Sequence, residues 1–294
     1  MPSKQIWGLL LVILLKTAFL PVVDAEESFA YYSPENVLKF ADFLYAQGDY
    51  LRAADEYQRY LFYQPQESTQ IRYKIAVCYR FGGKTEQAIQ GFEALLRTDP
   101  ESQFVSRAYY QIGATYFLQG QFERSVQFLG EALPRIMDAR QHAEAEQLIG
   151  LSYLKQKQWS EASEIFKALQ ASDIIPIREK AEVYQIYAEK GADLPTRSPF
   201  LAGTLSTVIP GAGRLYTGRF ADALNTLFTV GLTGWQAYDG FRRDGLSSAK
   251  GWTLGTLCGI FYVGNIYGSV ISARVYNRHV TEEFLATLTV ELPY

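Results

Sequence analysis

The sequence has few of the side chains on which most enzyme active sites depend. Only two histidines, His142 and His279, occur in 294 residues, and they lie far apart. Only two cysteines occur, Cys78 in a polar helical pattern and Cys258 in an apolar stretch. So few bases, nucleophiles and soft ligands argue against triad chemistry and against a zinc site. We therefore expect no enzymatic activity, no metal and no cofactor, and we expect both cysteines to be buried without a disulfide.

Charge is also scarce. Asp, Glu, Lys and Arg make up 20% of the residues, below the roughly 25% of ordinary soluble proteins. The formal net charge of −3 gives no electrostatic attraction to nucleic acid, so no nucleic-acid partner is expected. Aromatic residues are abundant instead, with 21 Tyr and 18 Phe. Aromatics at this density are typical of helical repeats and of membrane interfaces.

Residues 1–25 have the order of a secretory signal peptide. Lys4 precedes an uninterrupted apolar run, Ile6–Leu15, and the small residue Ala25 stands where a signal peptidase would cut. This run is too short for a hydrocarbon core that needs about 20 residues. We expect cleavage after Ala25, with an uncleaved anchor as the alternative. Either way, the next domain is expected outside the cytoplasm, which is the periplasm in a bacterial cell.

One helical-hairpin pattern occurs four times between residues 34 and 173, with core positions 35, 37 and 37 residues apart. Each helix of a copy has a small residue, which lets antiparallel helices approach closely, and a larger residue three or four positions later. These pairs are Ala41/Leu44, Ala76/Tyr79, Gly113/Tyr116 and Gly150/Tyr153, then Ala53/Tyr57, Ala88/Phe92, Ser125/Leu129 and Ala162/Phe166. Gly48, Gly83 and Gly120 mark the turn between the two helices, and Lys157 takes this position in the fourth copy.

This pattern resembles the tetratricopeptide repeat. The resemblance implies an all-α fold, a right-handed helical solenoid over residues 26–195 that ends in a capping helix at residues 178–190. The first helix of each repeat lines a concave groove that suits a protein or peptide partner. The residues expected to point into this groove are Asp42, Tyr45, Tyr73, Lys74, Arg80, Phe81, Tyr110, Phe117 and Gln147. The same spacing also suits packing between repeats, so both interpretations stay open for these side chains.

The last third of the chain is predicted to form a transmembrane helical hairpin. Residues 221–241 and 252–272 are each long enough to cross about 30 Å of hydrocarbon. Trp235, Trp252 and Tyr276 lie toward the ends of these runs, as interfacial aromatics do. Buried helices of a soluble protein are the alternative, because polar residues interrupt both runs.

A short apolar segment, residues 199–209, precedes the hairpin but cannot cross a membrane. We assign residues 196–279 to a membrane hairpin domain and residues 280–294 to a C-terminal tail. Small-xxx-small pairs in the second run, such as Gly255/Gly259, would allow close helix contact.

A segment rich in turn-forming residues, "VIPGAGRLYTGR", separates the short apolar segment from the first predicted span. It is not a nucleotide loop, since it lacks the Gly-Lys-Ser/Thr ending and a preceding strand. It resembles the Pro-Gly-x-Gly-x-x-Tyr-x-Gly signature of small bacterial two-helix membrane domains, which implies topology and not activity. The motif residues are Pro210, Gly211, Gly213, Arg214, Tyr216, Gly218 and Arg219. The two arginines are expected at the lipid interface, either as solvated charges or as ligands of a phospholipid head group.

Two functions fit these features. The first is a membrane-anchored periplasmic scaffold, in which the repeats bind protein partners and the hairpin contacts lipid in the bacterial inner membrane, in a setting such as cell-envelope assembly. The second is a lipid-binding, channel-like or translocation component that the repeats regulate. Arg242, Arg243 and Lys250 suit a cytoplasmic hairpin loop. Arginines also flank the hairpin on its other side, so the predicted signal peptide decides the expected orientation.

Overall fold

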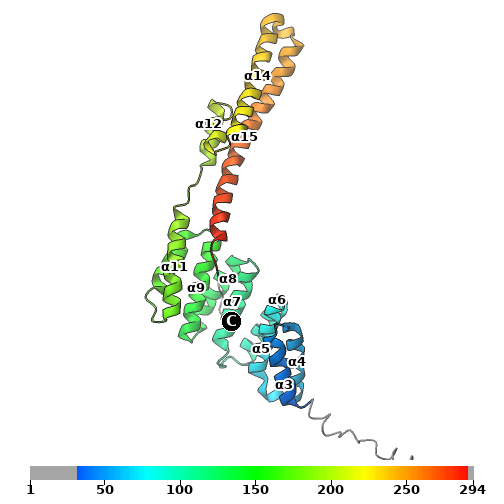
Figure 1. The fold of residues 1–294 in the computed structure, drawn as a ribbon, viewed down its shortest axis with the longest axis vertical. Coiled ribbons are helices and arrows are strands. Elements are labelled where there is room, and N and C mark those ends of the chain that lie inside the picture. Colours follow the sequence, from blue (N-terminus) through cyan, green and yellow to red (C-terminus); the bar gives the residue numbers. More distant parts are fainter. Residues whose placement is uncertain (1–31, 291–294) are drawn as a thin grey trace, which may run out of the picture. The chain divides into compact units, whose positions relative to one another are not determined.

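The computed structural model describes residues 32–290, in which every regular element is a helix (Figure 1). The predicted signal peptide lies outside the described residues. The helices are α3 (Pro34–Ala46), α4 (Tyr50–Tyr63), α5 (Ser68–Phe81), α6 (Thr85–Thr98), α7 (Val105–Leu118), α8 (Phe122–Ala132), α9 (Ala139–Lys155), α10 (Trp159–Leu169), α11 (Ile175–Ala192), α12 (Pro199–Val208), α13 (Ala212–Tyr216), α14 (Phe220–Asp244) and α15 (Ala249–Ala286). Three short 3₁₀ turns complete them: η1 (Pro65–Glu67), η2 (Leu133–Arg135) and η3 (Gly245–Ser247). The expected all-α fold is confirmed.

The chain forms two compact units. The first comprises residues up to Gln156 together with Ala168–Ala181, and the second comprises Lys157–Lys167 and the residues from Glu182 onward. The domain boundaries expected at residues 25, 195 and 279 stay predictions.

In the first unit, α3 to α9 pack in sequence order, each against its neighbours along the chain (Figure 1). The small residues that open the repeats are buried, which allows the close helix approach that the sequence predicts. Gly48, Gly83 and Gly120 have φ values of 79°, 74° and 72°, and Lys157 has φ 65°. The expected turns are therefore confirmed, including the one where a non-glycine residue takes the left-handed conformation.

The large residues of the repeat pattern form the core. Tyr57, Phe92, Leu129 and Phe166 are each at most 1% exposed. Complete burial of one such side chain contributes about 1.5–3 kcal/mol relative to leaving it in water. The packing leaves no spare volume at Gly113, where an added Cβ would lie 2.4–2.7 Å from the side-chain atoms of Leu129.

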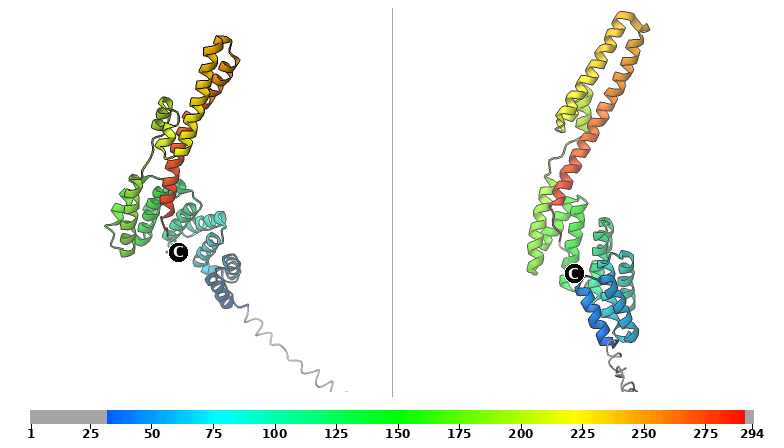
Figure 2. Two further views of the ribbon diagram at one scale, coloured as in Figure 1. Left: turned by 45° about the horizontal axis from the view of Figure 1, so that its top comes forward. Right: turned by 45° about the vertical axis from the view of Figure 1, so that its right-hand side comes forward.

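In the second unit, α14 runs alongside α15, and η3 connects them (Figure 2). Glycines allow the closest approach, since a Cβ on Gly240 would lie 2.7 Å from the backbone nitrogen of Gly251. Within residues 32–290, α15 is the helix that is both long and apolar enough to cross a membrane. The expected first span, residues 221–241, is long enough to cross a membrane but is less apolar than α15. Asp222, Asn225 and Asp239 lie within it.

The helix α15 continues past residue 279, where the hairpin domain was expected to end and the tail to begin, and it ends at Ala286. The physical reason is that residues 269–286 contain neither glycine nor proline, so nothing in the sequence ends the helix. Phe284 near its end packs against Trp159 and Tyr187, with ring centroids 6.1 and 5.6 Å apart. These aromatic contacts belong to the second unit.

Candidate functional site: a repeat surface and a clamped glycine turn

Two of the predicted groove residues, Asp42 on α3 and Lys74 on α5, form a polar and aromatic cluster with Tyr57 of α4. Asp42 accepts a hydrogen bond from the buried Tyr57 hydroxyl, and Lys74 Nζ lies 2.6 Å from Asp42 Oδ1. Burial, followed by the bond to Asp42, raises the pKa of Tyr57 far above its usual value. Asp42 and Lys74 are both partly exposed, so their charges are paired in the free protein and accessible to a partner.

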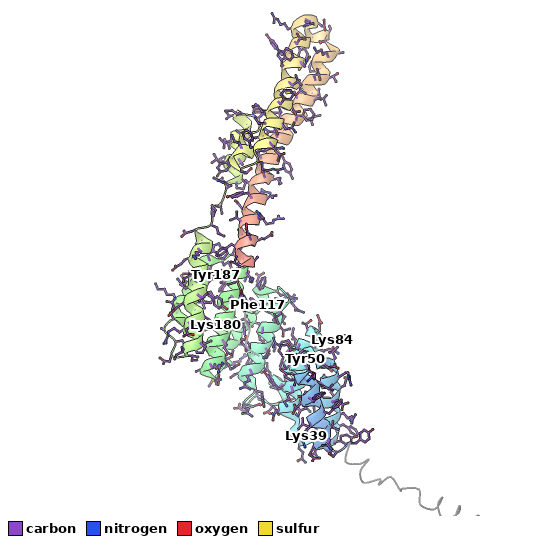
Figure 3. All side chains as sticks on the ribbon, in the orientation of Figure 1. Lys39, Tyr50, Lys84, Phe117, Lys180 and Tyr187 are labelled. Carbon is purple, nitrogen blue, oxygen red and sulfur yellow. The ribbon has the colours of Figure 1, made fainter. Side chains whose placement is uncertain are left out.

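Aromatic rings continue this surface. Tyr45 and Phe81 are half-buried, and Tyr50 lies between them with ring-centroid distances of 5.5 and 5.0 Å. Burial raises the pKa of Tyr45, so the ring keeps its neutral hydroxyl. Tyr50, labelled in Figure 3, is absent from the predicted set because it begins the second helix of its repeat, where sequence reasoning does not expect groove residues.

Four predicted groove residues are instead buried: Arg80, Tyr110, Phe117 and Gln147 are 2–7% exposed. For these residues the packing interpretation applies. Phe117 (Figure 3) packs against Phe122 of the next helix, with ring centroids 5.2 Å apart.

Tyr73 is half-buried: it is partly accessible at the surface and also packs against other repeat residues. Its ring stacks on Phe104 at a centroid distance of 5.1 Å, and its hydroxyl accepts a hydrogen bond from Gln111 at 3.3 Å. Burial raises the pKa of Tyr73. Asp42, Tyr45, Tyr73, Lys74 and Phe81 thus remain at least partly accessible, and together with Tyr50 they form what we call the repeat surface.

The glycine turn at residues 209–218 is built for close backbone contact. Gly211 has φ 90°, and a Cβ on it would lie 2.3 Å from the carbonyl oxygen of Ala223. A Cβ on Gly213 would lie 2.0 Å from the carbonyl oxygen of Ala202. No side chain fits at either position, which is the physical reason for this pair of glycines in the motif.

Asn265 of α15 holds the turn in place. It is 2% exposed, accepts a hydrogen bond from the Gly211 N–H at 3.0 Å and donates one to the Ser206 carbonyl at 3.1 Å. The helical partner of that carbonyl would be residue 210, which is proline and has no N–H. Asn265 therefore replaces the donor that Pro210 lacks. We call Asn265 and these two backbone groups the asparagine clamp.

Hydroxyl groups extend the contact between the turn and α15. Ser206 Oγ donates to Ser269 Oγ at 2.7 Å and accepts from the Gly213 N–H at 2.9 Å. Thr217 and Ser272 pair through their hydroxyls at 2.7 Å. The sequence pattern shows that polar residues interrupt both apolar runs, but it did not lead us to predict a role for these serines. The positions of Asn265, Ser269 and Ser272 on α15 follow helical spacing, and this one-sided polar stripe is the signal that indicates a partner.

The three charged or aromatic members of this region have different environments. Arg219 forms an ion pair with Asp222, and Tyr216 accepts a hydrogen bond from the Ser198 N–H at 3.2 Å. Arg214 lies over Gly268, whose missing side chain leaves room for the guanidinium. Its Nε is buried and has no hydrogen-bond partner among the described residues.

Within residues 32–290, no three His, Cys, Asp or Glu side chains come together as a metal site requires. The repeat surface offers one ion pair, hydroxyls and aromatic faces, which suit recognition of a polypeptide. The turn offers a rigid polar contact inside an otherwise apolar unit.

Comparison with known proteins identifies the repeats. Residues 38–103 and residues 106–133 match tetratricopeptide repeat families. A search of curated proteins finds no significant match.

Similar solved structures include MamA residues 41 to the end from Desulfovibrio magneticus RS-1 and the MamA RS-1 ArsTM double mutant. Each is 15% identical with a TM-score of 0.39, and the alignments cover 54% of this chain and 95% or 96% of MamA. Another is the C-terminal part of a TPR repeat-containing protein from Cytophaga hutchinsonii, 15% identical, with a TM-score of 0.28 and coverage of 86% and 100%. The repeat-family matches agree with the helical repeats of the first unit, and residues 38–103 and 106–133 of the chain are therefore identified as tetratricopeptide repeats.

Proposed function

We propose that the protein is a membrane-anchored scaffold whose tetratricopeptide repeats bind a protein or peptide partner on the periplasmic side of a bacterial inner membrane. The repeats support the scaffold role, since stacked repeats of this kind form extended surfaces for other proteins. The repeat surface supplies accessible aromatic rings beside an ion pair, which is the composition of a protein-binding patch. We propose no catalytic activity, because the histidines and cysteines are few and scattered.

One observation carries the membrane assignment: α14 and α15 expose an uncharged apolar belt. No charged residue occurs in residues 223–238 or 251–273, which span about 24 and 35 Å as helices. Side chains project outward along both helices (Figure 3). The exposed large apolar ones include Phe228, at 69% exposure, and Val263, at 65%. A belt of this size on a protein surface is typical of a membrane or protein interface, and its height fits about 30 Å of hydrocarbon.

The ends of the belt support the same assignment. Trp235 and Trp252 are exposed toward the η3 end, as aromatic residues at a membrane interface are. Asp239 at this end forms ion pairs with Arg243 and Lys250, both at 2.9 Å. Pairing lowers the cost of placing a carboxylate near hydrocarbon.

The helix α12 fits partial insertion. Its ten residues reach only about 15 Å, too short to cross. One face, with Ala202 and Ser206, is buried in the unit, whereas Phe200 and Val208 are 83% and 77% exposed. The irregular backbone that follows is hydrogen-bonded by the asparagine clamp, as backbone at membrane depth must be.

Alkaline carbonate extraction of membranes tests the anchor. We expect the full chain to stay in the pellet. Ile260→Lys places a charge at a 61% exposed position of the belt. In a bilayer this charge costs about 2.5–3.5 kcal/mol, so retention should fall, whereas at a soluble surface it would be nearly neutral. Ile186→Lys, at a 50% exposed position of α11 outside the belt, is the matched control. Release of the wild-type chain would refute the anchor.

Reporter fusions test the orientation. We expect alkaline phosphatase fused after Pro195 to be active, and the same enzyme fused within residues 243–248 to be inactive. The reverse pattern would place the repeats on the cytoplasmic side.

Partner capture by the full chain separates the scaffold from the alternative of an active membrane component. Asp42→Ala with Lys74→Ala removes the ion pair of the repeat surface, and we expect capture of crosslinked partners to decrease. Asp49→Ala with Arg52→Ala removes an exposed ion pair outside that surface and serves as the matched control. Capture that survives the first double variant but is lost when Ile260→Lys is introduced would favour recognition by the membrane unit.

A further inference from the structure

Two arginines in the second unit hold their guanidinium groups without a carboxylate partner. Arg214 Nε and Arg197 Nε are buried, and neither has a hydrogen-bond partner among the described residues. Neither arginine forms an ion pair within residues 32–290, whereas Arg219 and Arg243 in the same unit both do. A partly buried cation without a counter-ion is costly, so a structure that holds one in place indicates an anion from outside the chain.

Each guanidinium is held in a defined position by its neighbouring residues. Arg214 lies over Gly268, with Nη2 2.7 Å from the position that a Cβ would occupy. Arg197 stacks on the rings of Tyr216 and Tyr276, at 5.1 and 5.5 Å from their centroids. Asn277 fixes the backbone of Arg197 through two hydrogen bonds, at 2.7 and 2.9 Å.

From these positions, we propose that Arg214 binds a phosphate group and that the phosphate belongs to a membrane lipid, with Arg197 providing a second cation nearby. Gly268 and Tyr276, the α15 residues that contact Arg214 and Arg197, are eight residues apart, about 12 Å along the helix. A guanidinium offers a planar set of N–H donors that matches phosphate oxygens, and its charge is permanent.

The surroundings favour a lipid over free phosphate. Gly268 lies within the uncharged run that ends at residue 273, so the guanidinium sits at the edge of the proposed hydrocarbon layer. Leu215 and Tyr267, next to Arg214 and Gly268 in the chain, are 54% and 69% exposed. Acyl chains cover apolar surface of this kind, whereas inorganic phosphate does not. This inference rests on the proposed membrane anchor.

The test titrates phosphatidylglycerol into the full chain in neutral detergent and measures the rise in unfolding temperature. Arg214→Gln removes the cation. Gly268→Ala keeps it, but the new Cβ displaces the flexible end of Arg214 from its position. Two controls match these changes. Arg219→Gln removes a carboxylate-paired arginine, and Gly264→Ala adds a Cβ to α15 where nothing lies within 4 Å.

We expect the apparent affinity for phosphatidylglycerol to fall at least tenfold in Arg214→Gln and Gly268→Ala and to stay within twofold in the controls. Equal effects in all four variants would overturn the assignment, as would no effect in any. Diacylglycerol, which lacks phosphate, should not reproduce the stabilisation. If inorganic phosphate reproduces it fully, the ligand is free phosphate and the lipid assignment is wrong.

Failure of this inference is distinguishable from failure of the anchor. Carbonate release of the wild-type chain would refute both. Retention of the chain in the membrane with unchanged lipid affinity in Arg214→Gln and Gly268→Ala would refute the phosphate site alone.

Discussion

Replacing Asn265 with alanine should release the glycine turn from α15. The variant loses both bonds of the asparagine clamp and leaves the Gly211 N–H and the Ser206 carbonyl buried without partners. An unsatisfied buried group costs about 1–3 kcal/mol. Measured side-chain hydrogen bonds in membrane proteins average only about 0.6 kcal/mol, because the opened state also finds partners. For the two groups together, we therefore expect the free energy of opening the turn to fall by about 2–4 kcal/mol, which is the lower part of their summed range.

Hydrogen exchange of the full chain in micelles measures this loss at the turn. At 1.4 kcal/mol per tenfold, 2 kcal/mol corresponds to about a thirtyfold increase in the opening equilibrium. Exchange should accelerate by at least this factor in peptides that cover residues 199–216, while peptides from the repeats stay unchanged.

Asn225→Ala is the matched control, because Asn225 is exposed on α14. Equal exchange at the turn in Asn265→Ala and Asn225→Ala would refute the clamp. A uniform acceleration over the whole chain would also refute it, since the argument requires a local opening.

Two further predictions concern the repeats, and denaturant unfolding of the full chain measures both. Gly113→Ala should lower the free energy of unfolding by about 1–3 kcal/mol, because the new Cβ overpacks against Leu129. Gly130→Ala, where nothing lies within 4 Å of the new Cβ, should raise it by about 0.5–1 kcal/mol. A change of the same sign in both variants would contradict the packing. Burial raises the pKa of Cys78 from its usual value near 9 to about 12. The folded protein thus favours the neutral thiol, and this contribution to stability is complete below pH 9 and declines as the pH rises toward 12. Cys78→Ala should lose less stability than wild type between pH 8 and 11, and an identical pH dependence would disprove the assignment.

The repeat helices were predictable because their signals are local. A small residue and a large residue at helical spacing set the packing face, and a glycine marks the turn. Lys157 shows that position in the repeat decides the turn conformation even without glycine, because it takes φ 65° at the same place. Four of the predicted groove residues, including Tyr110 and Phe117, are buried. Their spacing did not distinguish burial from exposure in the groove, because residues on the buried face and on the groove face of a repeat helix recur with the same period.

The sequence by itself determined that this is an all-helical repeat protein with an apolar C-terminal part, since helix periodicity and apolar runs are properties of neighbouring residues. Only the tertiary structure decided why polar Asn265 lies inside an apolar helix: its partner Gly211 is 54 residues away in the chain. The same holds for Arg214, whose position is open because Gly268 on another helix has no side chain. Contacts between distant segments depend on how the helices meet, which no spacing within one segment encodes.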